Sequence, residues 1–316
     1  MKRYLSILTF ILVFSPGANA QPGWVWLNSG GTTHLYDICF PTDLTGYLVG
    51  WDGVVKKSTD GGISWITLRS DPGNHLYAVC FLNAMEGIVG GENGRILKTI
   101  DGGLSWALAT TPAANPIKDL CMINATLGYA VGLYATFWKT TDGGVTWTSI
   151  GPSTPAWMMS VDFVDAMNGY ASGSMFSIFK TSDGGGSWVS VMSGNTGQVD
   201  CVDFWDVNNG LASGDYGKIY RTTDGGANWN EIVPPTSKIL NNILYTNASK
   251  VFAVGMDGAI LRSDDGGLNW AIQASGTSQS LYGLYKHSDQ VLWACGNGGT
   301  LLKTTSSGEP TGIDEP

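Results

Sequence analysis

The stretch Ser58–Trp65, with the sequence STDGGISW, returns five more times along the chain with little change. Successive copies lie 41 residues apart, so that the final tryptophans are Trp65, Trp106, Trp147, Trp188, Trp229 and Trp270. The acidic residues of the same copies are Asp60, Asp101, Asp142, Asp183, Asp224 and Asp265. An eroded seventh copy begins at Thr304, where Ser306 replaces the aspartate and no tryptophan follows. A fixed period of this length is typical of repeat architectures.

Two further columns of residues keep the 41-residue step. One is a glycine column, made up of Gly50, Gly91, Gly132, Gly173, Gly214, Gly255 and Gly296. The other is a basic column before each box, made up of Lys57, Lys98, Lys139, Lys180, Arg221, Arg262 and Lys303. Seven repeats without an insertion or a deletion indicate one continuous array of equal units.

Each repeat contains four short runs of residues that favour β-strands. In the first repeat these runs cover Leu35–Phe40, Gly46–Trp51, Val54–Thr59 and Trp65–Ser70, with clusters of Gly, Asn, Asp and Pro between them. Four-stranded units with a short period are the mark of propeller blades. The sequence therefore predicts an all-β, seven-bladed β-propeller in residues 21–305.

The two ends of the repeat region complement each other. Trp24 lies 41 residues before Trp65, which makes Trp24–Ser29 a fourth strand with no blade before it. The last repeat has three predicted strands, Ser280–Ser288, Val291–Gly296 and Thr300–Thr305, and lacks a fourth. We expect the N-terminal strand to complete the last blade and close the ring, because closure hides sheet edges that would otherwise invite aggregation.

The residues outside the repeats predict export. Residues 1–20 combine a basic start, an apolar run from Leu5 to Phe14 and a small-residue end at Ala20, which is the order of a cleaved secretory signal peptide. The expected location is the periplasm, the cell surface or the outside of the cell. Loss of Lys2 and Arg3 leaves 15 basic against 26 acidic residues, a formal charge of −11 that disfavours nucleic acid and membranes as partners. The polar tail, residues 306–316, is predicted to be disordered.

The repeated box has the chemistry of a turn. Its aspartate can accept hydrogen bonds from nearby backbone N–H groups, and its paired glycines supply a positive φ without a Cβ clash. The tryptophan can fold back over the turn and fill the gap between blades, where an aromatic ring buries on the order of 150–250 Å². Calcium sites need several oxygen ligands from one loop, which a single aspartate between glycines does not provide. All six boxes are therefore predicted to be structural, and no metal site or cofactor is expected.

These residues carry a family resemblance. The TTDGGVTW box at Thr140–Trp147, the GYAVG strand at Gly128–Gly132 and the pair Lys139-Thr140 resemble the Asp-box (BNR) propellers, most of all the photosystem II stability and assembly factors. The resemblance covers residues 24–308 and implies an exported, non-enzymatic, chaperone-like propeller that docks membrane-protein subunits. Members that act in photosystem assembly present an arginine-rich patch. This chain departs from that pattern, since its only arginines after the leader are Arg69, Arg95, Arg221 and Arg262.

The candidate binding face is formed by the turns between the second and third strands of the blades. These turns vary between repeats while the framework does not, and they carry the candidates Trp51, Glu92, Tyr134, Phe176 and Tyr216. Trp and Tyr are common anchors of binding surfaces, whereas Asp-Gly and Asn-Gly pairs are also ordinary hairpin turns. His34 and His75, with Trp157 in the same column, lie at the mouth end of the innermost strand. The two histidines could begin a metal site, but they are more simply polar rim residues copied by duplication.

Two classes of function remain. The leading hypothesis is an exported monomer that binds a protein or peptide partner through this face. The alternative is a glycan-binding or glycoside-hydrolysing propeller. Hydrolysis requires a pair of carboxyl groups about 5–10 Å apart. Its candidates are Asp37, Asp119, Asp162, Asp200 and Asp203 near the innermost strands, although no long loop insertion walls a substrate groove. Because innermost strands of neighbouring blades diverge, Cys39, Cys80, Cys121, Cys201 and Cys295 are predicted to be unpaired thiols.

Overall fold

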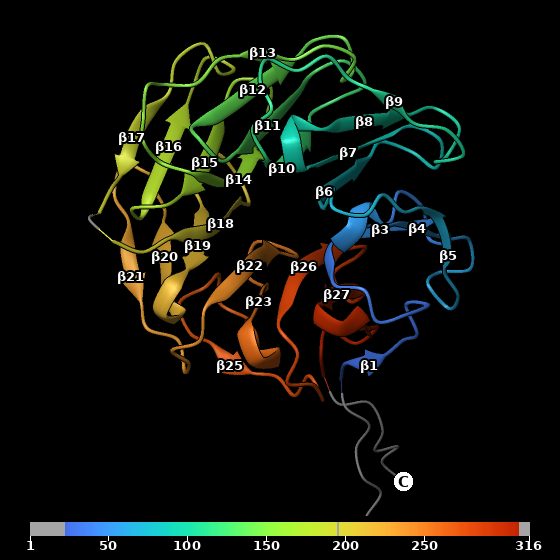
Figure 1. The fold of residues 1–316 in the computed structure, drawn as a ribbon. Helices are drawn as coiled ribbons and strands as arrows, with labels where there is room; N and C mark the ends of the chain where they lie inside the picture. The colour runs from blue at the N-terminus through green and yellow to red at the C-terminus, as the bar shows by residue number, and fades with distance from the viewer. Residues whose placement is uncertain (1–22, 195, 310–316) are drawn as a thin grey trace, which may run out of the picture.

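The computed structural model describes residues 23–194 and 196–309, which form seven four-stranded antiparallel sheets arranged in a ring (Figure 1). The predicted seven-bladed propeller is confirmed. Each observed strand of the first repeat is shorter than the predicted one, by one residue at one or both ends. The proposed signal peptide, residues 1–20, lies outside the described residues, as do residues 310–316 of the tail. Among the described residues, no helix is long and apolar enough to span a membrane.

The blades are numbered in chain order, and each begins with its innermost strand. Blade 1 consists of β2 (Leu35–Cys39), β3 (Gly46–Gly50), β4 (Val55–Ser58) and β5 (Ile66–Arg69). Blade 2 consists of β6 (Leu76–Phe81), β7 (Gly87–Gly91), β8 (Ile96–Thr99) and β9 (Ala107–Leu108). Blade 3 consists of β10 (Ile117–Met122), β11 (Gly128–Gly132), β12 (Thr136–Thr140) and β13 (Thr148–Ser149). Blades 4 and 5 consist of β14 (Met158–Phe163), β15 (Gly169–Gly173), β16 (Ser177–Thr181) and β17 (Val189–Met192); and β18 (Val199–Phe204), β19 (Gly210–Gly214), β20 (Ile219–Thr222) and β21 (Asn230–Ile232).

Blade 6 consists of β22 (Leu240–Tyr245), β23 (Val251–Gly255), β24 (Ile260–Ser263) and β25 (Ala271–Ile272), and blade 7 of β26 (Leu281–Lys286), β27 (Leu292–Gly296), β28 (Leu301–Thr304) and β1 (Val25–Trp26). Five of the turns between second and third strands are single 3₁₀ turns: η1 (Trp51–Gly53), η2 (Glu92–Gly94), η3 (Asp215–Gly217), η4 (Met256–Gly258) and η5 (Asn297–Gly299). β1 pairs with β28, with Val25 opposite Lys303, so the predicted closure of the last blade by the N-terminal strand is confirmed.

The glycine column is required by a close approach of backbones. The Cα of Gly50 lies so near β2 that a Cβ built on it would stand 2.0 Å from the carbonyl oxygen of His34. The other six glycines of this column meet the same carbonyl of their own blade, at 1.9–2.1 Å. A side chain at this position would therefore push the first two strands of the blade apart.

The box aspartates accept hydrogen bonds within the turns between the third and fourth strands. In the sixth box, Asp265 Oδ1 accepts the backbone N–H groups of Leu268 and Asn269 and the hydroxyl hydrogen of Ser263. The Ser263 hydroxyl in turn accepts the N–H of Gly267 at 2.9 Å. The indole N–H of Trp270 donates to the Gly267 carbonyl at 3.0 Å, so the ring folds back over the turn. In the described residues, no group of three His, Cys, Asp or Glu side chains could hold a metal ion.

Replacing Asp265 with alanine is expected to lower the free energy of unfolding by about 1–2 kcal/mol, because two backbone N–H groups lose their acceptor. In the described residues, the neighbouring Asp264 pairs only with Arg262, and its own side chain is 59% exposed, so Asp264→Ala is the matched control and should cost less than about 1 kcal/mol. Urea unfolding measures both values. Addition of EDTA should leave the parent curve unchanged; a shift in its midpoint would instead support the calcium interpretation of the boxes.

Neighbouring blades are joined by a repeated aromatic and polar contact. The ring of Tyr129 stacks on Phe163 of the next blade at 3.7 Å, and its hydroxyl donates to the carbonyl of Gly184 in that blade's box. Tyr47, two blades before, and Tyr170, one blade after, make the same contacts. The basic column has the same target: Lys139 Nζ donates to the Gly184 carbonyl at 2.7 Å. Hydrogen bonds from the basic column therefore bind six of the seven blades to the box of the next.

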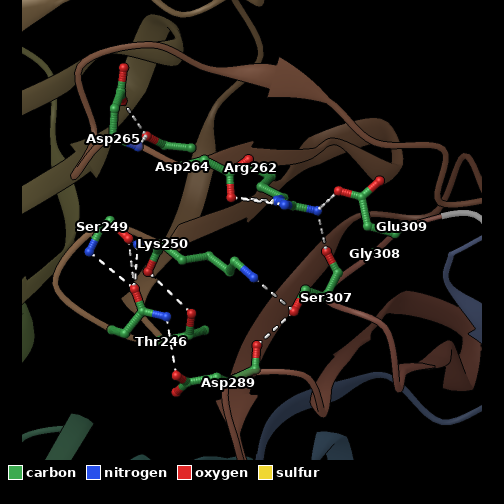
Figure 2. Close-up of polar contacts among 12 residues, drawn as sticks. Thr246, Ser249, Lys250, Arg262, Asp264, Asp265, Asp289, Ser307, Gly308 and Glu309 are labelled. Carbon is green, nitrogen blue, oxygen red and sulfur yellow. Dashed lines mark hydrogen bonds and ion pairs between the residues drawn. The ribbon is translucent and has the colours of Figure 1, made fainter.

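The same contact also joins the last blade to the first, at the two ends of the chain. Lys303, in blade 7, donates to the carbonyl of Gly61 in the box of blade 1, which continues the repeat around the ring. At the preceding step, Arg262 donates to the carbonyl of Ser307 at 3.0 Å and pairs with Glu309 (Figure 2). The Ser307 hydroxyl donates to the carbonyl of Asp289 at 2.7 Å. The eroded seventh box thus keeps its place in the ring without an aspartate.

The same contacts change the boundary of the tail. The sequence predicts a disordered tail over residues 306–316, whereas the structure places residues 306–309 in the turn of the last blade. The physical reason is that Thr304 Oγ1 still accepts the N–H groups of Ser306 and Gly308, as the equivalent hydroxyl does in the six intact boxes. The turn therefore forms although Ser306 has replaced the aspartate.

Candidate functional site in the central channel

The two predicted rim histidines each accept a backbone N–H from a turn of the candidate binding face. His75 Nδ1 accepts the backbone N–H of Asp52 at 3.1 Å, and His34 Nδ1 accepts that of Gly298 at 3.2 Å. The ring of Trp51 lies between the two imidazoles, with centroid distances of 5.0 Å to His34 and 4.8 Å to His75. The two histidines therefore support neighbouring turns and the exposed indole between them.

The other predicted rim residues form separate groups. Tyr134 and Trp157 meet edge to face at 6.1 Å and are both exposed. Tyr216 is exposed 6.4 Å from Phe176. Phe176 is itself half-buried and also contacts Tyr220 of the next blade. The rim therefore carries three aromatic groups rather than one continuous patch.

Inside the mouth, the innermost strands surround a cavity of about 370 Å³. Its lining includes one residue from the same position of every blade, which we call the channel ring: Tyr36, Tyr77, Lys118, Met159, Asp200, Asn241 and Tyr282. The ring joins the rim through Tyr77, whose hydroxyl donates to the Glu92 carboxylate and whose ring lies 6.4 Å from His75. Glu92, His75 and Trp51 therefore lie at the edge of one site that continues into the channel.

A β-bulge presents each ring residue to the channel. In β2 the pairing with β3 shifts between Leu35 and Asp37, which leaves Tyr36 as the extra residue. The pairing shifts at the same place in all seven innermost strands. Because a bulge breaks the alternation of side chains along a strand and re-aims the extra one, seven unlike side chains converge on the axis.

Four of the five carboxylates proposed for glycoside hydrolysis instead bind neighbouring blades together. Asp37 Oδ2 accepts the N–H of Val79 at 2.8 Å, and Asp119 Oδ2 accepts that of Val161 at 2.9 Å. Asp162 and Asp203 accept the N–H groups of Phe204 and Tyr245, each in the next blade. The fifth, Asp200, accepts a hydrogen bond from Gln198 on Oδ1, while its buried Oδ2 has no partner in the described part of the chain.

Burial shifts the acid–base properties of the channel carboxyls. It raises the pKa of Asp37 and of Asp200 to about 7, although backbone N–H groups and Gln198 respectively act in the opposite direction. It also raises the pKa of Asp119 and Asp203 to about 6, and that of Asp162, which faces Asp203, by a larger amount. Burial lowers the pKa of Lys118. The channel therefore gains protons as the pH falls from 8 to 5.

All five cysteines are free, as predicted. Cys39, Cys80 and Cys121 occupy the repeat position at which later blades carry Asp162 and Asp203. Burial raises the pKa of each of these thiols, so all three stay protonated at neutral pH. Cys39 and Cys121 pack in the apolar clusters between blades, as small, uncharged residues do.

Sequence reasoning predicted the rim but missed most of the channel ring. Of its seven members, only Asp200 was a candidate. The signal that would have found the ring is present in the sequence. The glycine column and the basic column each keep one type of residue, whereas this column reads Tyr, Tyr, Lys, Met, Asp, Asn, Tyr. A repeat position that changes chemistry in almost every blade is free of the common packing constraint, and such a position can acquire a specific role.

Comparisons with known proteins place the chain among propellers. Residues 18–114 and 104–243 match the family model described as photosynthesis system II assembly factor YCF48. No curated protein matches the sequence. A solved structure of YCF48 bound to D1 peptide is 20% identical with a TM-score of 0.77, covering 93% of this chain and 100% of its own. YCF48 from Cyanidioschyzon merolae is also 20% identical, with a TM-score of 0.75, and covers 89% of this chain and 98% of its own.

A glycosidase shares the fold as well. The GH74 xyloglucanase from Xanthomonas campestris is 14% identical with a TM-score of 0.75, and covers 94% of this chain and 55% of its own. At this level of identity, the similarity to each of these solved structures shows the common propeller fold.

Proposed function

Because the chain belongs to the family of photosynthesis system II assembly factor YCF48, we propose that it is an exported, non-enzymatic assembly factor that binds a peptide segment of a partner protein. The observation that carries this proposal is the exposed Trp51, held between His34 and His75 at the mouth of the channel. One family member with the same fold has been solved with a bound peptide. The proposed location after export is the periplasm, the cell surface or the outside of the cell.

The chemistry of the rim suits a peptide. Rigid aromatic side chains supply contact area at a low cost in conformational entropy and are typical anchors of binding surfaces. The Trp51 ring packs against two imidazoles, at centroid distances of 5.0 and 4.8 Å, so part of its rotational freedom is already lost before binding. The neighbouring Glu92 carboxylate can accept hydrogen bonds from the backbone or from a basic side chain of the peptide.

Glycoside hydrolysis is less well supported. It requires two carboxyl groups across the scissile bond, one of which acts as an acid and the other as a nucleophile or base. Asp37, Asp119, Asp162 and Asp203 each accept a backbone N–H from the next blade, and among the carboxyl oxygens of the described residues only Asp200 Oδ2 is both buried and without a hydrogen-bond partner. A screen of the purified protein on chromogenic glycosides tests this alternative, and turnover would favour it over the peptide-binding proposal.

Replacing Trp51 with alanine is expected to weaken the capture of peptides at least tenfold, since truncation of an aromatic anchor costs about 2 kcal/mol or more. The measurement is binding of the purified protein to an array of overlapping peptides from exported and membrane proteins. Trp205→Ala is the matched control, because Trp205 is 42% exposed, as Trp51 is 41% exposed, and lies in a turn on the opposite face. Equal capture by both variants would remove the Trp51 face from consideration.

A further inference from the structure

We propose that the channel ring binds a small zwitterion of the α-amino acid class, whose carboxylate pairs with Lys118 and whose ammonium group pairs with Asp200. This site lies inside the channel and goes beyond the peptide-binding face proposed above. It would take a ligand that carries both charges on a few neighbouring atoms.

Lys118 supplies the group for the carboxylate. It extends from β10 into the cavity, where its Nζ lies 3.5 Å above the ring of Tyr77. No hydrogen bond or ion pair joins Lys118 to another residue in the described part of the chain. A partly buried ammonium group without an acceptor is costly, and a ligand carboxylate would offset that cost with charge-assisted hydrogen bonds.

Asp200 supplies the group for the ammonium. It extends from β18 into the same cavity, and its Oδ1 is held by Gln198. Its Oδ2 is buried and has no donor in residues 23–194 and 196–309. A ligand ammonium group can donate a hydrogen bond to this oxygen. Both unpaired polar groups of the cavity, Lys118 Nζ and Asp200 Oδ2, would then have a partner.

Lys118 and Asp200 line the same cavity. They belong to blades 3 and 5, and Met159 of β14 lies between them in the ring. In the described residues, neither forms an ion pair with the other or with a rim residue, although the rim carboxylate of Glu92 acts to raise the pKa of Lys118. A cavity of about 370 Å³ lies within the range of small-molecule sites, which is roughly 300–1,000 Å³.

The remaining ring residues define the body of the ligand. Tyr36 lies 5.1 Å from Tyr77 and 5.6 Å from Tyr282, so three tyrosine rings form a continuous wall beside Lys118. Together with Met159, they favour an apolar or aromatic ligand side chain over a charged one. We therefore choose L-phenylalanine and L-leucine as probes.

Isothermal titration calorimetry of the full chain with these two probes tests the proposal. Saturable binding of at least one free amino acid is expected, and the same compound as its N-acetyl derivative or its amide should bind at least tenfold more weakly. Equal binding of the N-acetyl form would assign the site to a carboxylate alone, as a polypeptide C-terminus provides, and would overturn the proposal. Equal binding of the amide would assign it to a cation alone and would also overturn it, as would the absence of binding by both probes at millimolar concentration.

Two variants taken from the ring itself test the named residues. Lys118→Met copies Met159, and Asp200→Asn copies Asn241, so each new side chain already occurs at the same position of another blade. Both should fold with a melting midpoint near that of the parent and lose at least tenfold in affinity for the free amino acid. Lys238→Met, which removes an exposed lysine of a rim ion pair, is the control and should bind like the parent. Parent-like affinity in folded Lys118→Met or Asp200→Asn would overturn the assignment.

Discussion

Replacing Trp24 with alanine is expected to lower the free energy of unfolding by about 3–5 kcal/mol, the cost of truncating a large buried aromatic side chain. Trp24 precedes β1 and is only 2% exposed. It packs between the last two blades, with its ring edge to face with Phe252 at 6.1 Å and against Leu284 and Leu302. The loss should be large because this one side chain connects the N-terminal segment to the core of the ring's last blades.

The matched control is Trp26→Ala, two residues further along the same segment. Trp26 is 49% exposed, so its replacement should change the free energy of unfolding by no more than about 0.5 kcal/mol. Urea unfolding followed by far-ultraviolet circular dichroism measures both variants. A similar loss of unfolding free energy in the two variants would mean that the segment stabilises the fold through the hydrogen bonds of its strand and not through the buried Trp24 ring.

Deletion of residues 21–30 extends the same argument from one side chain to the whole closure. It removes β1, the 2.7 Å hydrogen bond from Ser29 Oγ to the Gly299 carbonyl, and the carbonyl acceptors of the buried Lys56. The deleted protein should lose its single cooperative melting transition, since an opened ring exposes the edge of β28. A cooperative transition at the parent's temperature would contradict the closure derived from β1.

The blade number and the closure could be predicted from the sequence because both depend on the 41-residue step alone. Trp24, Trp65 and the five later tryptophans locate every fourth strand, whatever the details of packing. The inner wall could not be predicted in the same way. The bulge beside Leu35 breaks the period of two, so strand alternation does not reveal that Tyr36 faces the channel.

The role of the carboxyls was hidden for a related reason. Asp37 and Val79 belong to different blades, and only the angle between those blades brings the carboxylate to the N–H group. From sequence, Asp37, Asp119 and Asp200 are equivalent acidic residues on innermost strands. The structure separates them: the first two join blades, and the third faces the cavity with an unpaired oxygen.

The carboxyls that join neighbouring blades make the stability of the ring depend on pH. An unfolded chain titrates its aspartates near pH 3.9, whereas burial raises the pKa of Asp37 to about 7 and of Asp119 and Asp203 to about 6. The folded protein thus holds protons that the unfolded chain has released. The free energy of unfolding should therefore fall as the pH rises from 5 to 8. Each carboxyl contributes about 1.4 kcal/mol per unit by which its pKa is raised. Together, these carboxyls should lower the free energy of unfolding by several kcal/mol over this range.

Below pH 4 the sign reverses. Hydrogen bonds from Ser64 and Ser58 lower the pKa of the box aspartate Asp60 to about 2, and the equivalent bonds do the same for Asp101 and Asp183. A carboxyl with a lowered pKa stabilises the fold above its ordinary pKa and loses that contribution as the pH falls towards 2. Stability should accordingly be greatest between about pH 4 and pH 5, where the boxes are ionised and the channel is protonated.

The chain supplies its own control for this pH dependence. Blades 1 to 3 place Cys39, Cys80 and Cys121 where blades 4 and 5 place Asp162 and Asp203, and those thiols stay protonated throughout the window. The double variant Asp162→Cys/Asp203→Cys should therefore fold and show a clearly shallower decline of the unfolding free energy between pH 5 and pH 8. Urea unfolding at pH 5, 6, 7 and 8 gives both slopes. A parent whose stability is constant across this range, or a double variant with the parent's slope, would mean that the buried carboxyls do not control the ring, because no other change separates the two proteins.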